Sequence, residues 1–181
     1  RLFLGGRLEL TGGLRYFEDT VTLRETLPLP YDDGEKFDKL TPRAVLTWHA
    51  AAEATLYASY SEGFRSGSLQ LRSVVVANPA FPPVKPDELT NYEIGSKGSL
   101  FGGRLRYDTA VYYVDWQDVQ MNLSVLVNGV PTSALTNGKS ASGVGVDLAL
   151  AMEPAAGLEL GLSLGWNDLA SDTPVLWTNA A

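Results

Sequence analysis

The sequence contains no cysteine and only one histidine among its 181 residues. A disulfide framework, a cysteine-based metal site and a multi-histidine site are therefore excluded. The sequence also lacks any apolar run near the roughly 18–20 residues that a transmembrane helix needs. This excludes a protein that crosses a membrane with helices. A transmembrane β-barrel is not excluded, because each of its strands needs only about 10 residues of alternating character.

Positive charge is scarce and dispersed. The chain has 14 Lys and Arg against 21 Asp and Glu, which gives a formal net charge of −7. Nucleic-acid binding requires clustered Lys and Arg to neutralise phosphates. We therefore expect no nucleic-acid partner.

Apolar and polar residues alternate along much of the chain. Leu158–Trp166 is the clearest run, with apolar residues at the even-numbered positions and small or acidic residues between them. A period of two is typical of a β-strand. Leu40–Gly67 contains two such runs joined by His49–Glu53, which predicts an antiparallel hairpin. The predicted strands are Arg7–Arg24, Phe37–Trp48, Ala54–Phe64, Glu88–Leu100, Arg104–Val119, Ser142–Met152 and Leu158–Trp166.

The connections between these strands alternate in length. Tight turns are predicted at Ala50–Glu53, Phe101–Gly103 and Pro154–Gly157, and long loops at Leu27–Lys36, Arg65–Pro86 and Met121–Leu135. The last of these loops contains a turn signal, Asn128-Gly129. Gly12-Gly13 predicts a bend or bulge in the first strand. Short turns on one rim and longer loops on the other are typical of outer-membrane barrels.

The two faces of the predicted strands also differ. One face is apolar, with aromatic residues near the strand ends, as at the interfaces of a membrane. The other face mixes Gly, Ser and Ala with a few charges, which suits the interior of a wide barrel. Candidate residues of a substrate path on this lumen-facing side are Arg43, Arg65, Glu93, Lys97, Arg106, Asp108 and Asp147. The alternative for each is a cross-strand pair that keeps the lumen wet. A soluble β-sandwich remains open at this point.

Motifs for catalysis or cofactor binding are weak. Asn137–Ser140 is similar to the end of a phosphate-binding loop, but position 133 is Ser and a Gly-rich strand follows in place of a helix. His49, beside Trp48 at a tight turn, favours an interfacial residue over a catalytic one. Asp32-Asp33 fits no EF-hand spacing. We expect no catalytic residue, no metal site and no cofactor.

Several ordered segments resemble strands of TonB-dependent outer-membrane receptors. These segments are Gly13–Tyr16 with Glu18-Asp19, Leu40–Arg43 leading into Leu56–Gly67, Pro86–Lys97, Tyr112–Val119 and Asn137–Val144. Asp147 stands where the family usually has Glu. The resemblance covers nearly the whole chain, in order and at the family's spacing.

The resemblance implies an all-β fold, with antiparallel up-and-down strands forming part of a barrel of about 22 strands closed around a plug. Residues 1–181, with about seven strands, would be a partial receptor barrel domain. The plug, the TonB-contacting segment and the C-terminal strand would lie outside the chain. The implied function is import of a scarce nutrient, such as a ferric siderophore, across the bacterial outer membrane with TonB-derived energy. The implied partners are outer-membrane lipid, the nutrient ligand and TonB. A passive porin and a soluble binding or adhesin module are the alternatives.

Overall fold

The computed structural model describes residues 1–26, 30–79, 81 and 83–172. Within this part of the chain the elements are β-strands and one short helix. The elements are β1 (Leu2–Leu4), β2 (Leu8–Glu25), β3 (Tyr31–Ala51), β4 (Ala54–Arg65), α1 (Arg72–Ala77), β5 (Asp87–Leu100), β6 (Leu105–Gln117), β7 (Gln120–Val127), β8 (Val130–Asn137), β9 (Ala141–Ala155) and β10 (Leu158–Ser171).

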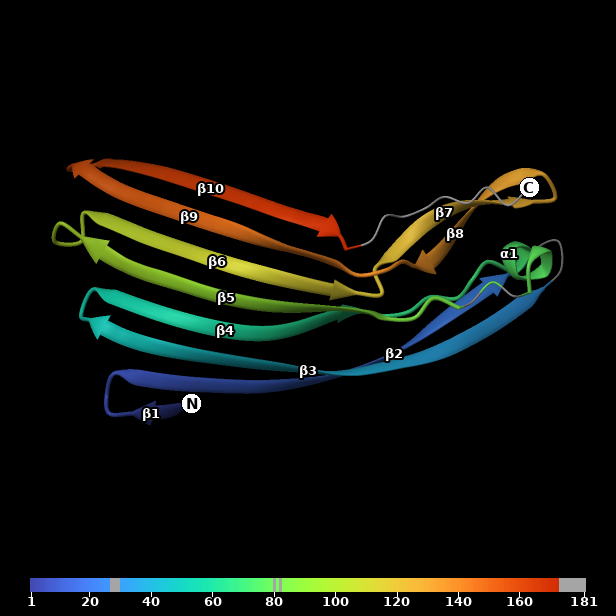
Figure 1. Cartoon of the computed structure of the whole chain (residues 1–181), viewed down its shortest axis with the longest axis horizontal. Coiled ribbons are helices and arrows are strands. Elements are labelled where there is room, and N and C mark those ends of the chain that lie inside the picture. Colours follow the sequence, from blue (N-terminus) through green and yellow to red (C-terminus); the bar gives the residue numbers. More distant parts are fainter. Residues whose placement is uncertain (27–29, 80, 82, 173–181) are drawn as a thin grey trace.

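Eight of the strands form one antiparallel sheet in the order β1-β2-β3-β4-β5-β6-β9-β10 (Figure 1). The remaining two, β7 and β8, form a separate hairpin between β6 and β9. The predicted all-β, up-and-down architecture is confirmed. Each of the seven predicted strands corresponds to one long strand of the sheet, and β1 is a further short strand at its edge.

Short turns and long connections lie at opposite ends of the sheet. The turns between β1 and β2, β3 and β4, β5 and β6, and β9 and β10 gather at one end, on the left of Figure 1. Helix α1 and the β7–β8 hairpin lie at the other end. The predicted sorting is therefore confirmed for the tight turns and for the two connections over residues 66–86 and 118–140. In the described residues no helix has the length and apolar character needed to cross a membrane.

The register aligns apolar side chains across the whole sheet. One row crosses all eight strands through Leu2, Leu10, Leu46, Ala58, Ile94, Val111, Val146 and Trp166. The leucines at 158, 160, 162 and 164 of β10 lie on the same face, and each is 49–56% exposed. A β-sandwich would bury such a face against a second sheet. This sheet leaves it open, which does not support the sandwich alternative.

Tyrosines mark one border of the apolar face. Tyr60, Tyr92 and Tyr113 are adjacent on β4, β5 and β6, with ring centroids 5.3 and 6.5 Å apart. Each of the three lies four or five residues inside the outer end of its strand. Beyond these tyrosines the same face becomes polar, with Glu62, Thr90 and Asp115 as the next neighbours along the three strands.

The buried apolar residues lie mainly beyond the sheet. Phe37, Val74, Val84 and Ala134 are each at most 7% exposed, and they come from β3, α1, the residues before β5, and β8. We call residues 66–86, the β7–β8 hairpin and the outer halves of β2 and β3 the cap. The cap has a small core of its own, whereas the sheet has one open apolar face.

Three local predictions were wrong. Tyr31–Lys36 belongs to β3 and pairs with β2, although residues 27–29 of the predicted loop lie outside the described residues. Met121–Leu135 is a hairpin, and both Asn128 and Gly129 have positive φ, 52° and 79°. That geometry favours a two-residue β-turn whose twist matches paired strands. Gly12-Gly13 pairs with Ala44 and Arg43 in uninterrupted register, without a bulge.

Candidate functional site

The polar face of the sheet brings four of the seven candidate residues together. Tyr57 donates a hydrogen bond of 2.7 Å from its hydroxyl to Oε1 of Glu93. Lys97 donates one of 2.6 Å from Nζ to Oδ2 of Asp108. The Lys97 ammonium also lies 5.5 Å from the centroid of the Tyr57 ring. Asp147 enters the same row through Gly95 and Ala110.

An open cavity of about 430 Å³ occupies the centre of this group. Tyr57, Glu93, Asp108 and Asp147 line it from β4, β5, β6 and β9, and Ser163 lines it from β10. Its walls offer hydroxyl and carboxylate groups, and one of these carboxylates, that of Asp108, accepts from Lys97. Such a surface suits a hydrated, polar ligand better than an apolar one. We call Tyr57, Glu93, Lys97, Asp108 and Asp147 the wall cluster.

Glycines opposite the tyrosines create the space for the cluster. Tyr57 pairs with Gly95, and Tyr112 pairs with Gly145. A Cβ at Gly95 would lie 2.4 Å from the Tyr57 ring, and one at Gly145 would lie 2.2 Å from the Tyr112 ring. Both rings therefore lie flat over backbone, an arrangement that only glycine permits.

The other three candidates lie apart from the cluster. Arg106 forms a salt bridge of 2.8 Å with Glu159, close to the short turns. Arg43 pairs with Gly13 and Ser61, and the described residues contain no salt bridge to it. Arg65 is the last residue of β4, at the opposite end of the sheet from the short turns.

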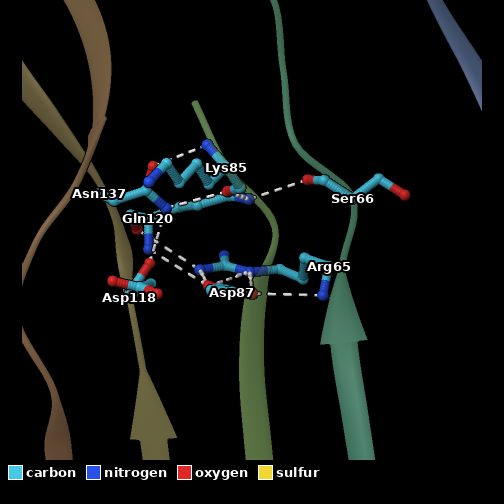
Figure 2. A network of polar contacts seen from close by, with 7 residues as sticks. All are labelled: Arg65, Ser66, Lys85, Asp87, Asp118, Gln120 and Asn137. Atoms are coloured by element: carbon cyan, nitrogen blue, oxygen red, sulfur yellow. Dashed lines mark hydrogen bonds and ion pairs between the residues drawn. The ribbon is translucent and has the colours of Figure 1, made fainter. Parts of the chain in front are cut away.

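Arg65 pairs with Asp87 at the outer rim of the sheet (Figure 2). Nε of Arg65 donates to both carboxylate oxygens of Asp87, at 3.1 and 2.9 Å, and Nη2 donates to Oδ2. The backbone N–H of Arg65 and that of Gln120 also donate to this carboxylate, each at 3.2 Å. The Asp87 side chain is 1% exposed. The guanidinium of Arg65 lies 5.0 Å from the centroid of the Trp116 ring.

Two side-chain amides extend this network. Nε2 of Gln120 donates to the carbonyls of Ser66 and Lys85, at 2.8 and 3.0 Å. Asn137 accepts from the N–H of Lys85 at 2.7 Å and donates to the carbonyls of Lys85 and Asp118, at 2.9 and 2.8 Å. We call the seven residues in Figure 2 the rim network: Arg65, Ser66, Lys85, Asp87, Asp118, Gln120 and Asn137.

Asp87 stays ionised in this network. It lies beyond Tyr92, outside the apolar band of the sheet. Burial raises the pKa of the Asp87 carboxyl, but the hydrogen bonds from the Arg65 side chain and from the N–H of Gln120 lower it by more. The pKa of Asp87 therefore lies below its ordinary value. A buried carboxylate with these donors is a fixed negative charge at neutral pH.

The sequence matches the protein family described as TonB dependent receptor-like, beta-barrel, over residues 1–180. The chain belongs to the TonB-dependent receptor β-barrel family. TonB-dependent receptors are proteins of the bacterial outer membrane, so the apolar face meets lipid and the polar face lines the lumen. The short turns are then periplasmic, and the cap is extracellular.

Known receptors match between 77% and 95% of the chain. It is 28% identical over 143 residues to the ferric-pyoverdine 358 receptor of Pseudomonas putida, covering 77% of this chain and 15% of that receptor. The alcaligin outer-membrane receptor FauA of Bordetella pertussis has a TM-score of 0.69 at 20% identity, covering 95% of this chain and 29% of FauA. The ferric yersiniabactin uptake receptor FyuA of Yersinia pestis has a TM-score of 0.66 at 18% identity, covering 93% and 26%. The chain thus spans less than a third of the length of each.

Sequence reasoning missed several residues of this receptor wall. Asp87 and Asn137 stand inside segments that resemble the family, but no role was assigned to either. Gln120 falls between the predicted strand that ends at Val119 and the predicted loop that begins at Met121. The one usable signal was an acidic residue directly after Pro86, at the start of a strand. The sequence identifies Tyr57 only as part of an alternating strand, because its pairing with Gly95 depends on the register between β4 and β5.

Proposed function

We propose that the chain is part of the wall of a receptor that imports a scarce nutrient, such as a ferric siderophore, across the outer membrane with TonB-derived energy. The row of apolar side chains that crosses all eight strands, with the wall cluster on the opposite face, carries this proposal. One face suits lipid, and the other offers a polar ligand a hydrated path.

The ligand class follows from several relatives. The matched proteins include receptors for ferric pyoverdine, alcaligin and ferric yersiniabactin, and a copper transporter. Three of these names state a metal or a metal chelate, namely ferric pyoverdine, ferric yersiniabactin and copper. We therefore propose a metal chelate as the cargo of this receptor, which acts by binding and release without catalysis.

The substrate path runs along the lumen-facing charges. In this proposal Glu93, Lys97, Asp108 and Asp147 contact the hydrated cargo or the protein that fills the lumen. Arg43 and Arg106 lie on the same path, on either side of the cluster along the strands. Arg65 acts at the extracellular rim through Asp87.

The rest of the receptor lies outside these residues. Residues 1–181 form one part of the barrel domain, and a plug domain, a TonB-contacting segment and a C-terminal strand belong to the full-length protein. The small share of each relative that the chain covers supports this division. Contact with TonB is made through the plug region.

Uptake by cells tests the proposal. The full-length gene is deleted and restored in its host, and uptake of ferric pyoverdine carrying radiolabelled iron is measured with and without a functional tonB gene. We expect uptake that saturates, needs the receptor and stops without TonB. Uptake that needs the receptor but continues without TonB would instead indicate a porin. If ferric pyoverdine gives no receptor-dependent uptake, the same measurement with ferric alcaligin and ferric yersiniabactin decides whether any of these chelates is cargo.

A matched pair of variants tests the path. Asp147→Asn changes a carboxylate of the wall cluster, whereas Asp115→Asn changes one on the opposite face, beyond the tyrosine band. We expect the half-saturating concentration for uptake to change several-fold only in the first variant. Equal effects of the two substitutions would contradict the proposed path.

A further inference from the structure

The two long extracellular connections begin and end beside one buried carboxylate. Residues 66–86 join β4 to β5, and residues 118–140 join β6 to β9 through the β7–β8 hairpin. Arg65 and Asp87 flank the first connection and pair directly with each other. Gln120 starts the hairpin, and its N–H donates to Asp87 at 3.2 Å. Asp87 therefore joins both connections through a single side chain.

The side-chain amides of Gln120 and Asn137 form further hydrogen bonds between the same two connections. Ser66 and Lys85 are the first residue of the first connection and its next-to-last, and the Gln120 amide donates to both of their carbonyls. Asn137, the last residue of β8, pairs through its side chain with both backbone groups of Lys85. A β-bridge between Ser68 and Val84 closes the base of the first connection. The ends of both connections thus share one set of hydrogen bonds (Figure 2).

The hydrogen bonds at position 87 require a carboxylate side chain. Its two oxygens accept five hydrogen bonds from Arg65 and Gln120, and the side chain is 1% exposed. An amide at this position would turn an NH₂ group toward one of these donors, because only one of its two terminal atoms accepts. It would also remove the negative charge that pairs with the Arg65 guanidinium.

We propose that Asp87 is a positioning residue that couples the two extracellular connections. It holds residues 66–86 and the β7–β8 hairpin in one shared orientation above the lumen, so that they move as one body. The use of this coupling for ligand capture rests on the proposed function above. The coupling itself is a property of the receptor without ligand, so it is measured without ligand.

Distances between spin labels measure the coupling directly. Val76 on α1 and Leu126 on β7 are 70% and 71% exposed, one on each connection. This chain has no cysteine, so Val76→Cys and Leu126→Cys add a single pair of labelling sites to it. The pair is introduced into the full-length receptor in outer membranes, and pulsed electron paramagnetic resonance gives the distance distribution.

A narrow distribution is expected for the parent and a broad one for Asp87→Asn, whose width roughly doubles because Arg65 loses its ion-pair partner at the base of both connections. Asn137→Ala is expected to broaden it less, because the Asp87 contacts remain. Two control substitutions, Asp108→Asn in the wall cluster and Gln117→Ala beside the rim, are expected to leave it narrow. Heat-modifiable migration of each variant on gels reports whether the barrel has assembled.

An assembled Asp87→Asn receptor with the parent's distribution would overturn the proposal. If Asp87→Asn does not assemble, Asn137→Ala decides, and an unchanged distribution there would equally overturn it. A receptor that keeps its narrow distribution but imports none of the tested chelates would contradict the proposed function and leave the coupling standing.

Discussion

Tyr57 lies across Gly95, its directly paired neighbour on β5, while its hydroxyl donates to Glu93 two residues along the same strand. The ring therefore bridges backbone and carboxylate on the lumen face. This arrangement places an aromatic ring at the edge of the cavity and fixes the direction of the Glu93 side chain.

Gly95→Ala should disturb this arrangement. The new Cβ would lie 2.4 Å from the Tyr57 ring, so the ring must move and its hydrogen bond to Glu93 must break. We expect a loss of about 1–3 kcal/mol in the free energy of unfolding, as for overpacking elsewhere. Urea unfolding of the full-length receptor in lipid vesicles measures it. Gly161→Ala is the matched control, because the nearest atom to its Cβ is 3.9 Å away. Equal losses for the two variants would refute this reading of Tyr57.

Arginine on the two faces of β10 should have opposite consequences. Leu162→Arg places a charge on the lipid face, and Ser163→Arg places it in the lumen beside the wall cluster. We expect Leu162→Arg to lower the free energy of unfolding by about 2–4 kcal/mol, the cost of an arginine near the middle of a bilayer. Ser163→Arg should fold almost normally. The same vesicle assay compares them, and a larger loss for Ser163→Arg would reverse the assigned faces.

The rim network should loosen in acid. Because the folded pKa of Asp87 is lowered, its ionised form stabilises the rim above the unfolded pKa of about 3.9. This contribution is lost as the pH falls through the folded pKa. Arg65 is its ion-pair partner, and the other contacts come from Gln120 and Trp116. The distance distribution between labels at positions 76 and 126 should therefore stay narrow at neutral pH and broaden below about pH 4.

Asp87→Asn provides the control for this titration. The distance distribution of Asp87→Asn should already be broad at neutral pH, and it should not broaden further in acid. Asp108→Asn should broaden in acid as the parent does. Broadening of the same size in Asp87→Asn would show that another group causes the loosening.

The strands of the wall were predictable because their signal is local. Leu158–Trp166 alternates without a break, and no partner strand is needed to recognise it. The turn at Asn128-Gly129 was equally visible. The strands beside it were not, because β7 and β8 are short and carry polar residues that are common in loops.

The remaining features depend on partners far away in the sequence. Tyr31–Lys36 contains Asp32, Asp33 and Gly34, all of low strand propensity, yet β2 supplies a full set of pairing partners and Arg24 binds Asp32 at 2.9 Å. Tertiary pairing outweighs local preference there. The seven lumen-facing charges followed from alternation alone. Their grouping around a cavity, and the role of Asp87 between Arg65 and Gln120, depend on register and on loop geometry.

The orientation of side chains along β10 is the most direct test of the whole account. Single nitroxide labels at positions 160 to 165 of the full-length receptor in outer membranes report access to oxygen, which concentrates in lipid, and to a water-soluble nickel chelate. We predict strict alternation, with labels at Leu160, Leu162 and Leu164 reached by oxygen and labels at Gly161, Ser163 and Gly165 reached by the chelate. Equal access of the chelate to both sets, or a repeat of three to four residues as in a helix, would contradict a wall with one face in lipid and the other in water.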